Sequence, residues 1–489
     1  MHGTRNPLIS KSKYVSGLQC EKLLWTHYNA KDRIPPFDPE TLAIFKQGHE
    51  VGELAQQIAP GGEEVPFGSI ARTVAKTNEL LELRKPIYEA SFAAGTVYCR
   101  VDILRPTSNR KWDLLEVKSS TKVKDVNIHD IAVQAHAIQF AGLELDRLYL
   151  VHIDRAYIRK GDIVPTELFH AEDVTDRVHA IAHQVGPNLQ RFVRMLDGPE
   201  PDVPIGTHCE YPYECPLKAR CWAHLPADDP TTLAGAGKQG TQWVERGIAR
   251  AVDVPDDELS ERQRVQVAAL EAGTPRLDAP QIREWLDRLE YPLILLDFEA
   301  FATAVPLLQG ASPFDAVAFQ ASVHLIDAPG AEPTHLEFLD ASRDDPRPAL
   351  ADFLATLPAD GSVMAWHASY ERRMLRELAI EAPGRAAQLE SLDRRLVDLE
   401  DPFRKFHYYH PAQKGSTSIK AVLPALIGQS YAGDAIEGGQ QAAREYARVV
   451  YGDVPAEERD GVLQALREYC RKDTWSMVEI LRVLESLDD

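Results

Sequence analysis

The sequence predicts an α/β protein with two sheet-containing domains. Two apolar strand patterns each end in charged residues, WDLLEVK at residues 112–118 and LILLDFE at residues 293–299. Strand and helix patterns alternate after both of them, as in an α/β fold. A chain of 489 residues is also too long for one typical hydrophobic core. We therefore expect one domain at residues 1–225, a helical connector at 226–285 and a second domain at 286–489.

Composition indicates the environment of the protein. Its hydrophobic content of 44% is ordinary for a globular protein, and no apolar run reaches the length of a membrane-spanning helix. The N-terminal residues lack the long apolar segment of a signal peptide. We therefore expect a cytoplasmic protein that does not contact a membrane. The sequence does not indicate a protein partner.

The net charge of −20 is distributed unevenly along the chain. Residues 1–225 hold 27 of the 54 Lys and Arg residues but only 29 of the 74 Asp and Glu residues, so most of the excess acid lies beyond them. A local basic groove can coexist with an acidic exterior. Net charge therefore neither supports nor excludes a nucleic-acid substrate.

The first domain is predicted to contain a hairpin that brings two acids together. Strand patterns at residues 98–104 and 112–118 are joined by a turn-like segment, which would place Asp102 beside Glu116. Strand alternation puts Glu116 and Lys118 on one face. The other predicted elements are helices at 14–25, 41–58, 71–83, 127–142 and 174–196 and strands at 87–92 and 147–153.

Two carboxylates and an ammonium group at a sheet edge suit metal-assisted phosphate chemistry. Asp102 and Glu116 would bind a hard divalent cation, and Lys118 would offset phosphate charge or hold the attacking water. The alternative is a half-exposed strand with an ordinary Glu/Lys pair. His49, four residues before Glu53 on an amphipathic helix, is by its pattern more often a packed or surface residue than a metal ligand.

Three cysteines occur in a loop-like segment with five residues between successive thiols: Cys209, Cys215 and Cys221. Prolines at 212 and 216 disfavour a helix there, and disulfides are not expected in a reducing cytoplasm. We expect a metal or iron–sulfur site with Cys20 as its fourth ligand. Zinc with four thiolates remains the alternative. The other two cysteines, Cys99 and Cys470, are expected to be packed residues.

The second domain is predicted to place four acids and one tyrosine in a common pocket. Strand patterns at 291–301, 316–326, 335–339 and 362–366 and helix patterns at 348–357, 369–380 and 457–487 follow the order of an RNase H-like fold. Asp297 and Glu299 share one face of the first strand, Glu371 lies in the first turn of a helix, and Tyr469 precedes Asp473 by one helical turn.

Four clustered carboxylates repel one another unless cations lie between them. Two Mg²⁺ or Mn²⁺ ions would relieve the repulsion and support in-line phosphodiester cleavage, with Tyr469 holding or deprotonating the water. The alternative is that these acids are ordinary solvated residues, although Asp297 ends an apolar run and needs a partner. Residues 414–420, KGSTSIK, could either meet phosphate through Lys420 and backbone N–H groups or simply cap a helix.

Three segments of the second domain, DFE, SYERRML and YCRKD, together resemble the tyrosine-bearing DEDD exonucleases of the RNase H-like superfamily. Glu371 stands where most members have aspartate. The first domain resembles the RecB-like PD-(D/E)XK nucleases, and the matching positions are His49, Asp102, Glu116, Lys118 and Gln134. Its four cysteines match the iron–sulfur motif of that group. Two departures are Ile138, which replaces a common tyrosine, and the wide spacing of Cys209 and Cys215.

The whole chain resembles a bacterial family that joins these two nuclease domains, through stretches such as HDIAVQAHAIQ and KGSTSIKAVLPAL. The resemblance implies a DNA phosphodiester hydrolase with a RecB-like site, a 3′–5′ exonuclease site and a [4Fe-4S] cluster, in repair, end-processing or defence. One alternative is an RNA 3′–5′ exonuclease whose first domain serves for binding. The other is a catalytically inactive iron–sulfur scaffold that binds nucleic acid.

Overall fold

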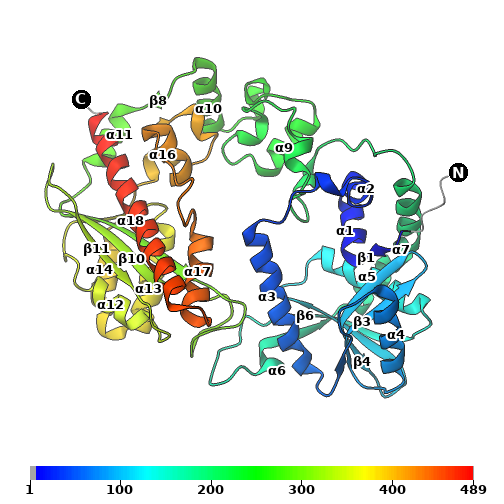
Figure 1. Cartoon of the computed structure of the whole chain (residues 1–489). Coiled ribbons are helices and arrows are strands. Elements are labelled where there is room, and N and C mark those ends of the chain that lie inside the picture. Colours follow the sequence, from blue (N-terminus) through cyan, green and yellow to red (C-terminus); the bar gives the residue numbers. More distant parts are fainter. Residues whose placement is uncertain (1–6, 488–489) are drawn as a thin grey trace. The chain divides into compact units, whose positions relative to one another are not determined.

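The computed structural model describes residues 7–487, which form two compact units (Figure 1). The first contains the described residues up to His224 and a later segment, Thr303–Phe314. The second contains Leu225–Ala302 and the described residues from 315 onward. Both units combine helices with a β-sheet, which confirms the predicted α/β class. The predicted connector at 226–285 belongs to the second unit.

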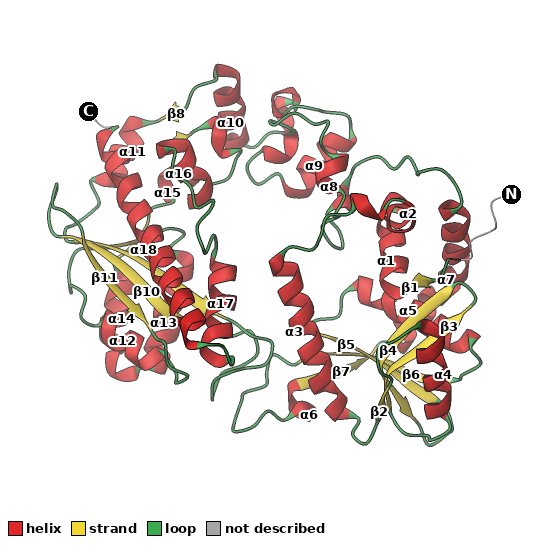
Figure 2. Ribbon diagram, viewed as in Figure 1, coloured by secondary structure: helices red, strands yellow, loops and turns green. Residues whose placement is uncertain are grey.

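The first unit is built on a seven-stranded mixed sheet (Figure 2). Its strand order is β2-β3-β4-β5-β6-β7, and β1 pairs in parallel with β4. β3, β4 and β5 are antiparallel neighbours, β6 runs parallel to β5, and β7 is antiparallel to β6. The strands are β1 (Ile9–Ser10), β2 (Glu63–Glu64), β3 (Ile87–Ala94), β4 (Val97–Pro106), β5 (Trp112–Lys118), β6 (Leu145–Ile153) and β7 (Phe169–Asp173).

The helices of the first unit pack on this sheet through apolar side chains. α5 (Asp125–Phe140) is the crossover between the parallel strands β5 and β6, and it is buried along most of its length against β3, β4 and α7. α7 (Thr175–Leu196) buries one apolar face that includes Val185, Leu189 and Phe192. The remaining helices are α1 (Lys11–Gln19), α2 (Glu21–Asn29), α3 (Pro39–Ala55), α4 (Ile70–Leu81), α6 (Pro165–Leu168) and α8 (Lys218–Cys221).

The later segment Thr303–Phe314 is held to the first unit by Arg159. The Arg159 guanidinium donates to the carbonyl oxygens of Pro306 and Leu307 over 2.9 and 2.8 Å. Its backbone N–H also donates to the Ala311 carbonyl over 3.0 Å. The sequence patterns did not predict this return of the chain.

The second unit is built on a five-stranded sheet of order β11-β10-β9-β12-β13. β9, β10 and β11 are antiparallel, whereas β12 runs parallel to both β9 and β13. The strands are β9 (Leu293–Phe301), β10 (Val317–Ile326), β11 (Thr334–Leu339), β12 (Ser362–Ala365) and β13 (Leu396–Asp398), and a separate pair is formed by β8 (Arg276–Leu277) and β14 (Tyr408–Tyr409).

Alternation along β9 separates its apolar core face from its acidic face. Ile294, Leu296 and Phe298 join a core with α12 (Arg347–Leu354), α13 (Ser369–Glu381) and α14 (Ala386–Arg394). Asp297 and Glu299 therefore point to the opposite face, where α17 (Gly439–Tyr451) and α18 (Ala456–Ser486) pack against β9. The other helices are α9 (Gly237–Glu245), α10 (Glu261–Ala272), α11 (Ala279–Leu286), α15 (Asp401–Arg404) and α16 (Ile419–Ile427).

A helix that crosses a bilayer must be both long and predominantly apolar. Within residues 7–487, none of the helices combines enough length with enough apolar character to cross a membrane. The longest of them, α18, is interrupted by charged residues such as Arg471, Lys472 and Asp473.

Candidate active sites and the cysteine cavity

Asp102, Glu116 and Lys118 meet where two strands of the first unit separate. The pairing of β4 with β5 stops one residue short of the two acids, and the Val117 N–H donates to Asp102 Oδ2 over 2.7 Å instead. Lys118 Nζ lies 2.7 Å from Glu116 Oε1. The two strands therefore separate at the point where the predicted acids and lysine lie close together.

Lys11, which the sequence patterns did not single out, belongs to the same group. It directly follows β1, whose pairing with β4 brings it beside the acids. Its Nζ donates to Glu116 Oε1 and Oε2 over 2.8 and 3.0 Å and lies 3.8 Å from Asp102 Oδ1. Asp130 of α5 pairs with Lys118 over 2.7 Å. The site therefore contains three carboxylates and two ammonium groups.

Desolvation and the two lysines set the charges at this site. Desolvation, reinforced by Glu116, raises the pKa of Asp102 to about 7. Desolvation would also raise the pKa of Glu116, but Lys11 and Lys118 outweigh it and hold that pKa well below its usual range. Gln134 Nε2 adds a hydrogen bond of 2.8 Å to Glu116 Oε2. Lys11 Nζ thus contacts the same two carboxylate oxygens that a divalent cation would use.

His49 does not join this group. It lies on α3, and its side chain is 75% exposed. Its Nε2 is 3.2 Å from Glu53 Oε1, an i, i+4 pair on the solvent face of the helix. The same helix buries Val51 and Ala55, so amphipathic packing turns His49 away from the interior. The structure thus places His49, a predicted metal ligand, on the exposed face of α3 and not among these acids.

Cys20 interrupts what the sequence patterns predicted as one helix at residues 14–25. It lies between α1 and α2 in an extended conformation, with φ −156° and ψ 119°. An extended residue cannot continue the i→i−4 ladder of hydrogen bonds, so the helix ends there and a new one begins. At this break Cys20 packs in one buried cluster with Cys209 and Cys215.

All four predicted ligand cysteines line one small cavity of the first unit. Three of them, Cys20, Cys209 and Cys215, are buried, and Cys221 is half-buried. None forms a disulfide. Burial, with a further contribution from the other thiols, raises the pKa of Cys215 to about 11. Four thiols around one cavity, three of them buried, are a donor set for a thiolate-bound metal centre, because a metal replaces the thiol protons.

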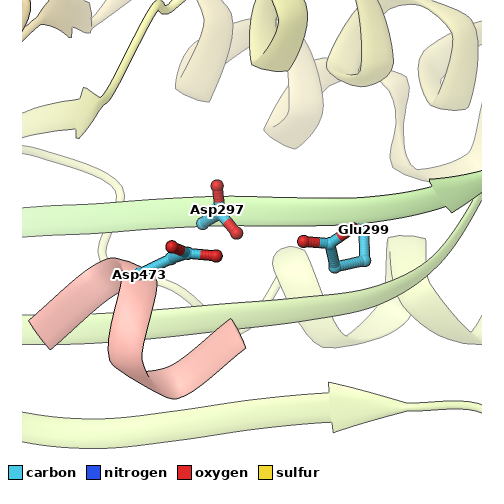
Figure 3. A group of neighbouring side chains, drawn as sticks. All are labelled: Asp297, Glu299 and Asp473. Carbon is cyan, nitrogen blue, oxygen red and sulfur yellow. The ribbon is translucent and has the colours of Figure 1, made fainter. Parts of the chain in front are cut away.

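The acidic site of the second unit brings together side chains from β9 and α18. Figure 3 shows Asp297 and Glu299 projecting from the strand toward Asp473 on the helix. One carboxylate oxygen from each residue lies within 4.8 Å of the other two. Among residues 7–487, these three form the one group of three or more candidate ligands that meets this distance. They fit a single hard divalent cation with oxygen ligands.

The carboxylates of this site have fewer neighbouring cations than those of the first unit, where Lys11 and Lys118 lie beside Glu116. Desolvation, followed by the other acids, raises the pKa of Asp297 well above its usual range. Desolvation likewise raises the pKa of Glu299 to about 8 and that of Asp473 to about 6. Lys420 opposes the rise at both Glu299 and Asp473. Raised carboxyl pKa values of this kind indicate a site that favours protons or metal ions.

Glu371 lies beside the three acids but outside their 4.8 Å group. It is 3% exposed in the first turn of α13, and it raises the pKa of both Asp297 and Glu299. Among the described residues, its Oε2 has no hydrogen-bond partner. A buried carboxylate oxygen without a partner is costly. Glu371 therefore offers an unused ligand atom at the margin of the site.

Tyr469 is buried one helical turn before Asp473. Desolvation, followed by the charge of Asp473, raises its pKa far above the usual range. Its hydroxyl forms a hydrogen bond that opposes the rise in the Asp473 pKa. The phenol is thus kept neutral and can donate a hydrogen bond within the site.

Comparison with known proteins adds one finding. Residues 294–418 match the family described as "Domain of unknown function (DUF2779)". The match begins in β9 and includes Asp297, Glu299 and Glu371, but it ends before Tyr469 and Asp473. No curated protein matches the chain.

Sequence reasoning missed Lys11 in the first unit and two side chains around the acidic site of the second unit, Cys470 and Tyr431. Cys470 was taken as a packed residue, but its Sγ lies 3.5 Å from Asp297 Oδ2. Its spacing of three residues from Asp473 on a helix could have revealed this. Tyr431 donates a hydrogen bond to Ser476 Oγ over 3.3 Å and, with Tyr469, lies beneath the Lys420 ammonium at ring-centroid distances of 5.5 and 5.8 Å. No sequence pattern signals Tyr431.

Proposed function

We propose that the chain is a metal-dependent nuclease whose second unit removes nucleotides from the 3′ ends of DNA. The observation that carries this proposal is the gathering of Asp297, Glu299 and Asp473 within 4.8 Å. Buried acids with raised pKa values, taken from a central strand and a distant helix, are costly unless they bind cations. The sheet order, with β9 at the centre and two parallel strands beyond it, supports an RNase H-like fold of the DEDD class. The 3′ polarity follows the resemblance described above.

The residues of this site have separable roles in phosphodiester hydrolysis. Asp297, Glu299 and Asp473 would hold the cation, with Glu371 as a further oxygen donor. When bound, Mg²⁺ or Mn²⁺ would polarise the phosphodiester and lower the pKa of a bound water. Tyr469 would position that water through its neutral hydroxyl rather than accept its proton. Lys420 would offset negative charge on the phosphate, since its ammonium already acts on Glu299 and Asp473.

We infer a second nuclease site, of the RecB-like PD-(D/E)XK class, in the first unit. Asp102 and Glu116 would be its metal ligands and Lys118 its phosphate- or water-binding group. The mixed sheet with the α5 crossover supports this fold. The carboxylates fit a divalent cation less well than those of the second unit, because Lys11 already occupies Glu116.

For the cysteine cavity we propose a [4Fe-4S] cluster rather than zinc. Tetrahedral zinc with Zn–S bonds of about 2.3 Å would bring its sulfurs to roughly 3.8 Å from one another. The four thiols line one cavity, but within residues 7–487 no three of them lie within 4.8 Å of one another. Wider thiol spacing suits a larger inorganic centre. The cluster would join the helix break at Cys20 to the loop at residues 209–221.

A cleavage assay tests the nuclease proposal. The full chain would be incubated with an end-labelled duplex carrying a 3′ overhang, and with single-stranded DNA and RNA of the same sequence, in Mg²⁺, Mn²⁺ or EDTA. We expect metal-dependent shortening from the 3′ end that Asp297→Asn abolishes and Lys118→Ala leaves in place. Internal cuts that Lys118→Ala removes would belong to the first unit.

The same assay separates the two alternatives. Shortening of RNA but not DNA would replace the DNA assignment by an RNA 3′–5′ exonuclease. Absence of cleavage on every substrate and metal, with iron present in the protein, would leave an iron–sulfur scaffold that binds nucleic acid.

A further inference from the structure

A cavity of about 660 Å³ lies in the second unit on the exposed side of α13. Its basic lining comes from Arg288, which follows α11 and pairs with Glu284, and from Arg372, Arg373 and Arg376 of α13. The residues beyond 225 carry most of the acidic excess of this chain, whereas this cavity is lined by four arginines and three acids, the acids being Glu377, Asp398 and Asp401. No role in the acidic site accounts for the arginines.

The guanidinium groups of this cavity differ in how many of their N–H groups already donate hydrogen bonds to the protein. Arg372 is occupied, since it donates to Asp393 and to the Leu396 carbonyl over 2.7 to 3.2 Å. Arg376 uses only Nε, which donates to Asp393 Oδ2 over 2.7 Å. Arg373 approaches Glu377 no closer than 4.0 Å and is 53% exposed. The outer nitrogens of Arg373 and Arg376 are therefore presented to the cavity.

Two of the three acids that line the cavity, Asp398 and Asp401, are paired with basic residues that lie outside its lining. Asp401 accepts hydrogen bonds from Arg404 and Lys405, and Arg404 also lies 3.5 Å from Asp398. The remaining lining is largely apolar and includes Trp285, Ile380 and Val397. A site with free guanidinium donors and an apolar wall suits a ligand that combines phosphate with a flat or hydrophobic ring.

The cavity borders the acidic site through α13. Ala368 and Ser369, at the start of this helix, line the cavity, and Glu371 follows in its first turn. Asp398 lines the cavity and also raises the pKa of Glu371. From Ser369 to Ile380 the helix extends for about 16 Å. The arginines thus continue away from the acids along the helix that carries Glu371.

We propose that this cavity binds phosphate groups of nucleotides, and that its occupant is the single strand whose 3′ end lies in the acidic site. This deepens the proposed nuclease function and rests on it for the identity of the strand. Arg373 and Arg376 contact the phosphates, and the apolar wall receives a base or sugar. Binding here holds the strand while successive nucleotides are removed.

Binding rather than cleavage tests the proposal. The full chain carrying Asp297→Asn, in EDTA, is titrated into labelled single-stranded DNA and RNA oligonucleotides across a range of salt concentrations. We expect Arg373→Ala/Arg376→Ala to weaken binding about tenfold and to reduce the slope of log K against log salt by roughly 1.4, since two phosphate contacts on a single strand are lost. Arg394→Ala/Arg482→Ala removes the same charge from exposed helix positions and should change neither value.

Three outcomes separate the possibilities. If only Arg373→Ala/Arg376→Ala weakens oligonucleotide binding, the result supports the proposal that the single strand occupies the cavity. Unchanged oligonucleotide binding with weaker binding of a labelled mononucleotide overturns the strand assignment in favour of a free-nucleotide site. If both double variants change oligonucleotide binding equally, the cavity is not a nucleotide-binding site. Because no cleavage is measured, each result holds whether or not the chain proves to be a nuclease.

Discussion

Lys11 Nζ lies 2.8 Å from one carboxylate oxygen of Glu116 and 3.0 Å from the other, across 105 residues of chain. A single ammonium group thus occupies both oxygens that a metal ion would need. Among the described residues, the acids of the second unit's site form no ion pair of this kind, and there the pKa of Glu299 is raised, whereas that of Glu116 is lowered. The two candidate sites therefore differ in how readily they accept a cation.

Removing the Lys11 side chain should strengthen metal binding in the first unit. We expect Lys11→Ala to tighten Mn²⁺ binding about tenfold, because the ion no longer displaces a charge-assisted hydrogen bond worth roughly 1.5 kcal/mol. Calorimetric titration of a chain carrying Asp297→Asn and Asp473→Asn would report this site. Lys13→Ala is the matched control, since Lys13 contacts His27 instead of an acid. Equal Mn²⁺ affinity in the two lysine variants would contradict the proposed competition.

The raised pKa of Glu299 predicts that the metal-free second unit loses stability as pH rises. The folded protein binds a proton on this carboxyl up to about pH 8, whereas the unfolded chain releases it near the ordinary value of 4.5. The free energy of unfolding therefore falls between these two pH values. Glu299→Gln cannot ionise, so its stability relative to the parent should increase over the same range.

Denaturant unfolding in EDTA at several pH values measures this difference. Saturating Mg²⁺ should remove it, because the bound ion stabilises the ionised carboxylates of the parent chain. A variant whose stability relative to the parent does not depend on pH between 4.5 and 8 would show that Glu299 ionises normally.

The sequence predicted the parts of both sites that depend on local periodicity. Alternation along β5 and β9 correctly placed Glu116 with Lys118 and Asp297 with Glu299 on common strand faces, because a period of two fixes which side chains share a face. Helical spacing similarly placed Tyr469 one turn before Asp473. These relationships need no knowledge of tertiary structure.

Relationships set by tertiary pairing were not predictable in this way. Lys11 reaches Glu116 because the two-residue strand β1 adds to β4, and so short a strand has no pattern of its own. No proline or glycine lies next to Cys20, and Gly17 is still within α1, so no adjacent residue signals the break. For His49, metal ligation rested on a family resemblance alone, whereas the amphipathicity of α3 agrees with its exposed side chain.

Loss of one cavity thiol should remove the proposed iron–sulfur cluster. We expect Cys215→Ser to abolish visible absorbance and iron content and to lower the melting temperature of the first unit, because the remaining thiols cannot replace a buried ligand. Cys99→Ser is the control, since Cys99 is buried in the sheet core outside the cavity. Iron retained by Cys215→Ser, or stoichiometric zinc in a colourless parent protein, would refute the assignment.

Tyr469→Phe should separate water positioning from metal binding in the second unit. The phenylalanine keeps the ring packing but loses the hydroxyl, which also contributes a hydrogen bond to Asp473. We expect kcat for removal of the 3′ nucleotide to fall about a hundredfold. Metal affinity should change little, because the carboxylates remain. Single-turnover rates at saturating Mg²⁺ measure the first effect and calorimetry the second.

Tyr446→Phe provides the control for this prediction. Tyr446 is also fully buried and stacks on Phe319 with ring centroids 3.7 Å apart, so its substitution removes a hydroxyl from the same unit without touching Asp473. A similar loss of rate in both variants would indicate general damage to packing. A normal rate in Tyr469→Phe would mean that the water is positioned by other groups, of which Tyr431 is the nearest candidate, because its hydroxyl also hydrogen bonds to Asp473.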